Sequence, residues 1–356
     1  MRVAVVGVGL IGGSIALAAR ARLGAEVTGF DIAPEALDLA LERGALDARA
    51  GSVAEAVAGA DAVFVTAPVG VLPDLVAEVL AAASPTCVIS DAGSTKRAVV
   101  AANEDARFVG GHPLAGAETA GVQHARADLF QAATWYLTPT STTSGVLYDR
   151  LFRLLTGLGA RPVAIDPETH DRILAVVSHL PHVLANVLVS QAAATLASDD
   201  ARLPATGPSF RDATRVAGAP SAIWTDIYAS NADALVVEID RALERLAAVR
   251  KSLAARDLAA IAAWNDAAAA DRRALLGSQL AGGELHELRV SVANRPGVVA
   301  QIALELGRAG VDIVDMALYP APDMTTGVVA LWIAGEEPVA RAQALVSGLG
   351  FPVARA

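Results

Sequence analysis

Two short segments of this 356-residue chain hold side chains that could act on a substrate proton. His112 lies in residues 110–116, where glycines and a proline predict a rigid loop that could present an imidazole to a hydroxyl. Ser94 lies in residues 90–96, which follow a predicted strand at the sheet edge where ligands bind in open α/β folds. Each segment also has a plainer interpretation, a solvated loop histidine for the first and a helix N-cap for the second.

Two further segments could bind an anion or a metal. His179 and His182 are three residues apart and share a helix face, and Pro181 is expected to kink that helix. No third ligand recurs at metal spacing, so we expect no metal site. Arg215 lies in an apolar helical region, where a guanidinium must either pair internally, for instance with Asp212, or bind an anion.

Residues 7–12 fit the pattern GxGxxG, which is a weak signal alone and a strong one in its setting. The segment follows a predicted strand at residues 3–6 and opens a predicted helix. Its glycines allow a tight turn, close approach of a pyrophosphate and close packing of the helix, whose N-terminus attracts phosphate. The predicted cofactor contacts are Gly7, Gly9, Leu10, Ile11 and Gly12.

Asp31 ends the second predicted strand, at the position of the acidic residue in dinucleotide-binding folds. Its carboxylate can accept hydrogen bonds from the adenosine ribose and would repel a 2′-phosphate. The sequence therefore predicts NAD rather than NADP as the cofactor.

These residues need a scaffold, and the first part of the chain provides one. Short apolar runs alternate with helical patterns up to about Asp166, the rhythm of a mostly parallel sheet covered on both faces. The predicted strands are residues 2–6, 26–30, 62–66, 87–90, 108–109 and 135–137. We expect an α/β fold whose residues 1–166 form a Rossmann-type dinucleotide-binding domain.

The pattern changes twice after residue 166. Residues 167–281 carry Ala/Leu-rich helical patterns and predict an all-helical substrate domain, in which an apolar helix from Trp224 to Leu246 favours a homodimer. Gly282 and Gly283 resemble a hinge. Residues 284–356 then have the pattern of a small βαββαβ domain.

The composition excludes several function classes. A net charge of −10 opposes binding to nucleic acid or to anionic membranes. The single cysteine, Cys87, excludes an internal disulfide and fits a reducing compartment. Glycines interrupt the apolar N-terminal run, unlike a signal peptide or a membrane helix, so we expect a cytoplasmic protein.

Taken in order and spacing, five motifs resemble the prephenate/arogenate dehydrogenase family over nearly the whole chain. The motifs are residues 7–14, residues 91–96, residues 110–116 with Glu118, residues 178–182, and Thr214 and Arg215 followed by Trp224. Residues 294–313 are similar to the start of an ACT domain, a small regulatory module that often binds amino acids.

The resemblance implies NAD-dependent oxidative decarboxylation of prephenate in tyrosine biosynthesis. In this reaction hydride leaves C4 of a cyclohexadienol, carbon dioxide departs and the ring becomes aromatic. A neutral His112 would accept a hydrogen bond from the 4-hydroxyl, and Ser94 would bond the same hydroxyl or orient His112. Accurate placement of C4 against the nicotinamide is the rest of the enzyme's task.

The resemblance also implies the substrate contacts. Arg215 would anchor a substrate carboxylate through a two-pronged contact, helped by His182 and, more weakly, by His179. Glu118 would pair with Arg215 when the pocket is empty.

An ACT-like module implies tyrosine as an effector, bound near residues 295–297. Asn294 stands where related modules often have aspartate, which puts the contact to an effector's amino group in doubt. A structural or dimer-forming role for the module stays open.

Other interpretations of the function remain open from the sequence. Arogenate differs from prephenate only by an amino in place of a keto group, and the sequence does not separate the two. A Rossmann domain followed by helices also describes 3-hydroxyacid dehydrogenases and pyrroline carboxylate reductases, which give no reason for the His112 and His182 motifs together. A non-catalytic NAD-sensing regulator is the remaining alternative.

Overall fold

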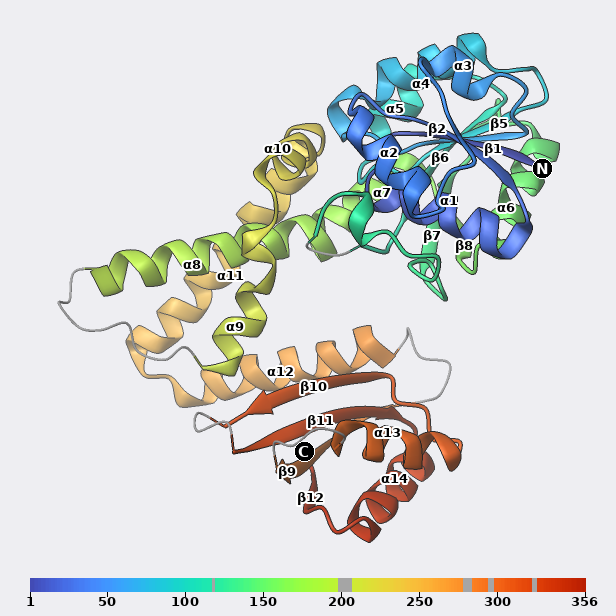
Figure 1. The fold of residues 1–356 in the computed structure, drawn as a ribbon. Helices are drawn as coiled ribbons and strands as arrows, with labels where there is room; N and C mark the ends of the chain where they lie inside the picture. Colours follow the sequence, from blue (N-terminus) through green and yellow to red (C-terminus); the bar gives the residue numbers. More distant parts are fainter. Residues whose placement is uncertain (117–118, 198–206, 278–283, 294–297, 322–324) are drawn as a thin grey trace. The chain divides into compact units, whose positions relative to one another are not determined.

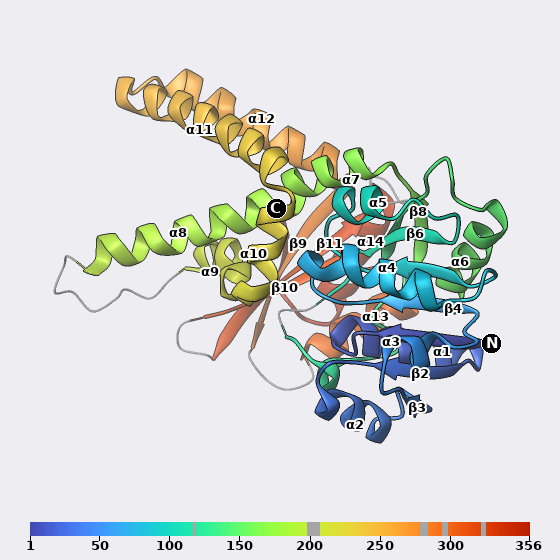
Figure 2. The ribbon, with the colours of Figure 1, turned by 90° about the horizontal axis from the view of Figure 1, so that it is seen from above.

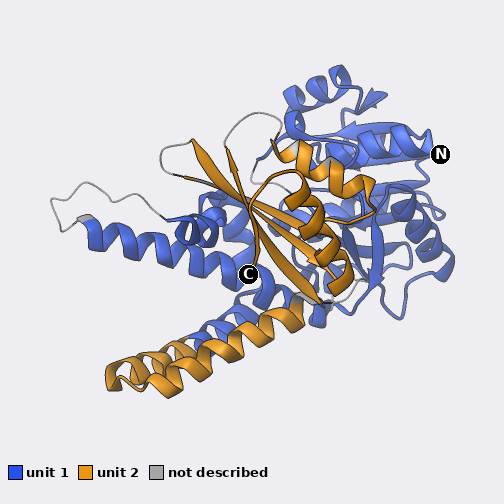
Figure 3. Cartoon of the chain, turned by 90° about the horizontal axis from the view of Figure 1, so that it is seen from below, with its two compact units in different colours: residues 1–242 blue, residues 243–356 orange. Residues whose placement is uncertain are grey.

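A computed structural model describes the chain except for residues 117–118, 198–206, 278–283, 294–297 and 322–324 (Figure 1). The chain divides into two compact units, Met1–Ala242 and Leu243–Ala356 (Figure 3). The predicted hinge at Gly282 and Gly283 lies outside the described residues. The predicted domain limits at residues 166 and 281 stay predictions.

The first unit is built on an eight-stranded sheet with the order β3-β2-β1-β4-β5-β6-β7-β8. Every neighbouring pair is parallel except β6 and β7. The strands are β1 (Arg2–Val6), β2 (Glu26–Phe30), β3 (Ala48–Arg49), β4 (Ala62–Val65), β5 (Val88–Asp91), β6 (Phe108–Pro113), β7 (Thr134–Thr138) and β8 (Arg161–Ala164). The strand order reverses direction between β1 and β4, which is where open α/β sheets bind their ligands. The predicted Rossmann-type sheet is confirmed.

Two hydrophobic cores cover the two faces of this sheet. Val3 and Val5 of β1 belong to one core, and Ala4 and Val6 belong to the other, because successive strand residues point to opposite faces. The first core includes residues of α1 (Leu10–Leu23), α2 (Pro34–Glu42) and α6 (Gly145–Gly157), and the second includes residues of α3 (Val53–Val57), α4 (Leu72–Ala82) and α5 (Arg97–Ala102). Burial on both faces explains why the central strands β1 and β4 are continuous apolar runs.

Helices follow the sheet, as the sequence predicts. They are α7 (Pro167–Leu174), a π-helical turn η3 (Ala175–His179), α8 (Leu180–Ala197), α9 (Pro208–Thr214), the 3₁₀ turn η4 (Arg215–Gly218), α10 (Ser221–Ser230), α11 (Ala232–Ala255) and α12 (Leu258–Gly277). The kink expected at Pro181 takes the form of the π turn just before it, where the N–H of Leu180 bonds to the carbonyl of Ala175. The prediction of a single helix from Trp224 to Leu246 is wrong, because the helix is interrupted at the buried Asn231, between α10 and α11.

The helical run Pro167–Leu196 is 30 residues long and apolar enough to cross a membrane by length and composition. It is the single such run among the described residues, and a core helix passes the same test. Figures 1 and 2 show α8 extending away from the sheet. The start of the run carries two buried polar residues, His170 and Asp171, that bond to groups of the sheet domain. These bonds anchor the start of the run in the sheet domain, while 28% of its most apolar stretch is buried.

The second unit holds a four-stranded antiparallel sheet with the order β10-β11-β9-β12. Its elements are β9 (Leu285–Ala293), α13 (Val298–Arg308), β10 (Asp315–Pro320), β11 (Thr326–Ala334), α14 (Glu336–Gly348) and β12 (Val353–Arg355). Leu288, Ile302 and Val346 belong to one core between sheet and helices. The predicted βαββαβ order is confirmed, and its assignment as an ACT-like module stays a prediction.

Candidate active site

A crevice of about 600 Å³ lies at the carboxyl ends of β1, β2 and β4. Gly7 turns the chain out of β1 with φ +95°, a conformation that favours glycine. A Cβ on Gly12 would lie 2.1 Å from the carbonyl oxygen of Gly7, so α1 packs against the turn only with glycine there. Leu10 and Ile11 begin α1, and their N–H groups face no partner within the helix. This geometry fits the pyrophosphate of a dinucleotide.

Asp31 lines the same crevice beside Gly7 and Gly9. Its two carboxylate oxygens accept hydrogen bonds from the N–H of Val8 at 2.6 Å and of Ala33 at 2.8 Å. The backbone therefore holds the carboxylate in place at the end of β2. Asp74 and Glu78 also line the crevice and add negative charge, which opposes a 2′-phosphate.

His112 lies on β6 opposite Tyr136 of β7, and not in a loop as expected from its glycine-rich surroundings. Its side chain is 9% exposed, so the interpretation as a solvated loop histidine is wrong. Its Nδ1 lies 2.9 Å from Nε2 of His170, and the two rings meet edge to face. The Nδ1 of His170 lies 2.8 Å from Oδ1 of Asp171. The three side chains form a continuous hydrogen-bonded chain.

Asp171 also caps α5 from a distant part of the sequence. Its carboxylate accepts the backbone N–H of Lys96 at 2.7 Å and of Arg97 at 3.0 Å, and Nε of Arg97 at 3.2 Å. Burial alone would raise the pKa of Asp171, but hydrogen bonds from His170, Arg97 and Lys96 outweigh burial and lower that pKa below its usual value. Asp171 is therefore a carboxylate that only accepts hydrogen bonds.

A buried ion pair holds the backbone next to His112. Lys96 Nζ donates to Asp91 and, at 2.8 Å, to the carbonyl of Gly111, and the Asp91 carboxylate accepts the N–H of Gly111 at 3.0 Å. Both side chains are fully buried. Burial lowers the pKa of Lys96, and the charge of Asp91 opposes that effect. The ion pair is hydrogen-bonded to both the N–H and the carbonyl of Gly111, the residue that precedes His112.

Both imidazoles at this centre are neutral near pH 7. Burial, followed by the nearby His170, Lys96 and His179, lowers the pKa of His112 well below its usual value. Burial also lowers the pKa of His170, although the hydrogen bond to Asp171 opposes it. A neutral imidazole can accept a proton, as a general base must.

His179 and His182 face the same aromatic side chain, as their spacing predicts. The ring of His182 stacks on Trp224 with centroids 3.5 Å apart, and His179 meets Trp224 edge to face. Nδ1 of His182 is hydrogen-bonded to the hydroxyl of Tyr228, while its buried Nε2 has no hydrogen-bond partner among the described residues. Burial lowers the pKa of His179 to about 4. A substrate oxygen could provide the partner that Nε2 of His182 lacks.

The remaining predicted site residues are placed as follows. Ser94 is half-buried in the loop between β5 and α5 and makes no side-chain hydrogen bond within the described part of the chain; His170, not Ser94, contacts the ring of His112. Arg215 is exposed at the start of η4, in contrast to the apolar surroundings expected for it. Glu118 lies outside the described residues. The roles predicted for these residues stay predictions.

The sequence analysis gave no role to five residues of this centre: Asp91 and Lys96, which lie in the motif at residues 91–96, and His170, Asp171 and Asn231, which lie in none. Asn231 donates to the backbone carbonyl of Asp171 at 2.7 Å and lies 3.1 Å from Nδ1 of His179. The available signal was a His–Asp pair in the first turns of an apolar helix and a lone asparagine within another. Polar side chains at such positions are expensive to bury unless they are paired.

The fold and the crevice define a dinucleotide-binding oxidoreductase with a helical second domain. A family model described as prephenate dehydrogenase, nucleotide-binding domain, matches residues 15–164, and one described as prephenate dehydrogenase, dimerization domain, matches residues 166–266. The chain is 32% identical to prephenate dehydrogenase of Bacillus subtilis over 347 residues, which are 95% of this chain and 93% of that protein. The chain belongs to the prephenate dehydrogenase family.

Solved structures agree with this assignment. Prephenate dehydrogenase from Aquifex aeolicus, in complex with hydroxyphenyl propionate and NAD+, is similar with a TM-score of 0.72 and 28% identity over 77% of this chain and 98% of that chain. Synechocystis arogenate dehydrogenase is similar with a TM-score of 0.65 and 26% identity over 76% of this chain and 99% of that chain. The Bacillus protein therefore matches a part of this chain that has no counterpart in either structure.

Two of the three glycines in the GxGxxG turn, Gly9 and Gly12, allow a paired test. Gly12→Ala is expected to weaken NAD binding at least about tenfold and to lower the melting temperature, because the added Cβ meets the backbone of Gly7. A Cβ on Gly9 would meet nothing within 4 Å of the protein, so Gly9→Ala should weaken NAD binding with little loss of stability. Calorimetric titration and thermal unfolding measure the two effects. Wild-type affinity in both variants would contradict the cofactor assignment.

Proposed function

We propose that this chain catalyses the NAD-dependent oxidative decarboxylation of prephenate to 4-hydroxyphenylpyruvate, in the cytoplasm and as part of tyrosine biosynthesis. The observation that carries the proposal is a buried, neutral His112 held at the carboxyl edge of a sheet that binds a dinucleotide. Bound NAD accepts the hydride. The protein's own residues must hold the substrate, exclude water and accept the hydroxyl proton.

His112 is the proton acceptor in this proposal. Because its Nδ1 is occupied by His170, the nitrogen left for the 4-hydroxyl is Nε2. Transfer of the hydroxyl proton to Nε2 lets the C4–O bond become a carbonyl-like bond as hydride leaves C4. Ser94, in the loop between β5 and α5, is proposed to bond the same hydroxyl.

Arg215, His182 and His179 hold the rest of the substrate in this proposal. His182 offers an unpartnered ring nitrogen, and Arg215 offers a two-pronged donor suited to a carboxylate. Glu118 keeps its proposed pairing with Arg215. Arogenate is the second candidate substrate, favoured by the similarity to the Synechocystis enzyme.

The deciding experiment measures NADH formation at 340 nm with prephenate and with arogenate as separate substrates. We expect kcat/KM to be higher for prephenate and the product to be 4-hydroxyphenylpyruvate.

The same assay with added tyrosine tests the proposed effector role of the C-terminal module, whose residues 295–297 lie outside the described chain. No turnover of either substrate would overturn the proposed function, and no response to tyrosine would leave the module a structural role.

Two substitutions separate the proposed chemistry from the proposed binding. His112→Asn is expected to lower kcat about 100-fold or more with unchanged NAD affinity, the usual scale for a lost general base. Arg215→Ala is expected to raise the KM for prephenate about 10- to 100-fold, the scale of a lost hydrogen bond to a charged group, with a smaller effect on kcat. Steady-state kinetics measures both. Near-normal turnover of the first variant, or an unchanged KM in the second, would remove that residue from the site.

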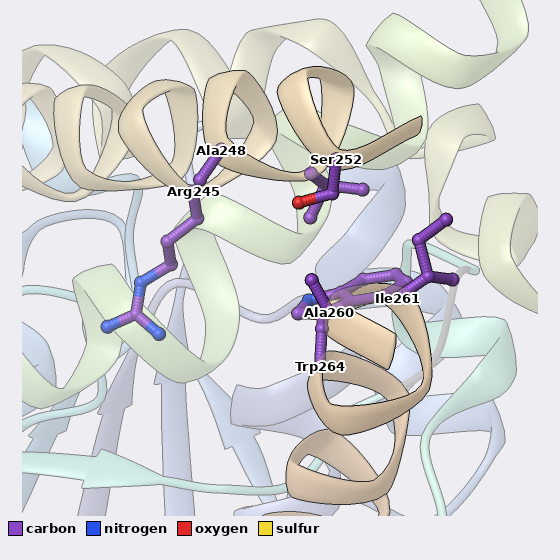
Figure 4. A pocket seen from close by; sticks show the side chains of 7 residues that line it. Arg245, Ala248, Ser252, Ala260, Ile261 and Trp264 are labelled. Carbon is purple, nitrogen blue, oxygen red and sulfur yellow. The ribbon is translucent and has the colours of Figure 1, made fainter. Parts of the chain in front are cut away.

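We also propose a homodimer built on the helical domain, in agreement with the family model's description of it as a dimerization domain. Apolar residues are exposed along its helices, among them Val187 and Leu188 of α8 and Val236 and Val237 of α11. A groove lined by Val249, Ile261 and the half-exposed Trp264 lies between the end of α11 and the start of α12 (Figure 4). Such surfaces are costly in water, so a second copy is expected to cover them. Light scattering should give twice the 36.2 kDa chain mass, and a monomer would contradict the proposal.

A further inference from the structure

We propose that His170, held by Asp171, is a positioning residue that fixes the tautomer of His112 and leaves the lone pair on Nε2. The inference rests on the proposed function, since it concerns the base of that reaction. It goes beyond that function by assigning a role to two fully buried residues that the proposed reaction does not use.

The direction of the hydrogen-bonded chain is set at Asp171. Three N–H groups from Lys96 and Arg97 already point at its carboxylate, and a carboxylate has no proton to donate. The bond of 2.8 Å to His170 therefore requires a proton on Nδ1 of His170. A neutral His170 then carries its lone pair on Nε2.

That lone pair decides the state of His112. Nε2 of His170 lies 2.9 Å from Nδ1 of His112, and one of these two nitrogens must donate. Because Nε2 of His170 is the acceptor, Nδ1 of His112 is the donor. The single proton of the neutral His112 ring is thus on the side away from the substrate, and Nε2 is free to accept one.

The proton balance of the step is simple. The hydroxyl O–H bond breaks, Nε2 of His112 gains the proton, and the positive charge of the new imidazolium is shared through its Nδ1–H bond to His170. As hydride leaves C4, the bond from the ring to its carboxylate breaks, carbon dioxide departs, and the electron pair of that bond restores the aromatic ring with the negative charge on the oxygen. Nε2 of His112 then returns the proton to this oxygen, which gives the phenol and restores the neutral ring. Asp171 lies at the far end of this chain and stabilises the charge. The other charged or titratable groups that face the two rings are Lys96, Asp91, His179, Arg97 and the edge-on ring of Tyr136.

The hydrogen-bonded chain of His112, His170 and Asp171 is in place before a substrate binds. His170 is fully buried, its carboxylate partner is bonded to the N-terminus of α5, and Asn231 donates at 2.7 Å to the carbonyl of Asp171. No rotation of these side chains is needed to form the base. Preorganisation of this kind is what a supporting group contributes to a catalytic side chain.

Two substitutions of His170 test its role in positioning His112. Both variants lose the hydrogen bond from His170 to Asp171, and they differ in whether the new side chain can accept a hydrogen bond from His112. The side-chain oxygen of Gln in His170→Gln can accept the proton of His112 Nδ1, and the Leu of His170→Leu cannot. We expect His170→Leu to lower kcat about 100-fold, with the KM for prephenate and the Kd for NAD within about threefold of wild type. We expect His170→Gln to recover kcat to within about tenfold of wild type.

A third variant adds a readout that a packing defect would not move. The Asp171 carboxylate raises the pKa of His170. His170 is hydrogen-bonded to His112 and shares the positive charge when His112 is protonated. Loss of the carboxylate in Asp171→Asn is therefore expected to make His112 harder to protonate and to shift the acid limb of the kcat/KM profile to lower pH. The profile covers pH 5 to 9, and melting temperatures report folding.

Equal kcat in the Leu and Gln variants of His170, or a kcat within threefold of wild type in His170→Leu, would overturn the inference. A wild-type enzyme that turns over neither prephenate nor arogenate would instead overturn the proposed function. An active wild type in which His112→Asn also remains fully active would place the base elsewhere and overturn the inference as well.

Discussion

The carboxylate of Asp171 connects the parts of the centre that lie far apart in the sequence. It receives donors from the start of α5 and from His170, and the backbone of the same residue receives the side chain of Asn231 at the junction of α10 and α11. A buried carboxylate is stable only when its oxygens are fully paired, and breaking such pairing costs about 3–5 kcal/mol. Docking of the helical segment against the sheet and placement of the His112 imidazole therefore depend on the same atoms.

A second ionic group performs a similar task for the backbone. The ion pair of Lys96 and Asp91 holds Gly111 by its N–H and its carbonyl, so β6 reaches His112 in one defined position. A Cβ on Gly111 would lie 2.6 Å from the carbonyl oxygen of Asp91, so the close approach of the two strands requires glycine. Two buried charged networks thus fix His112, one through its main chain and one through its ring.

Local patterns in the sequence predicted much of this structure. The strand runs at residues 2–6 and 26–30 match β1 and β2. Val3 to Val6 of β1 are all buried and leave a continuous apolar signal, whereas β2 alternates the buried Val27 and Gly29 with less buried residues. The cofactor turn was equally clear, since the glycines, the strand before them and the helix after them lie in one segment. The short β3 and the β8 strand, which has exposed residues, left no such signal.

The hydrogen-bonded chain behind His112 could not be predicted in the same way. His112 and His170 are 58 residues apart, and Asp171 reaches α5 across 75 residues. No periodicity encodes a bond between such positions, because it depends on how β6 and α7 meet in three dimensions. The break at Asn231 was missed for a related reason: within an apolar helical pattern, only the tertiary partners of an asparagine show that it ends a helix.

The π turn of Ala175–His179 lies between two groups of polar side chains on one helical run. His170 and Asp171 precede it and form the hydrogen-bonded chain with His112, whereas His182 follows it and faces Trp224. A π turn accommodates one residue more than an α-helical turn, and each residue of an α-helix rotates the chain by about 100°. Deleting a single residue here would restore a regular helix and leave the flanking helical stretches close to their present faces, but it would displace the residues of the turn itself, among them His179, which lies 3.1 Å from Asn231. The length of this segment is consequently constrained through His179, whose contacts with Asn231 and Trp224 depend on the extra residue of the turn.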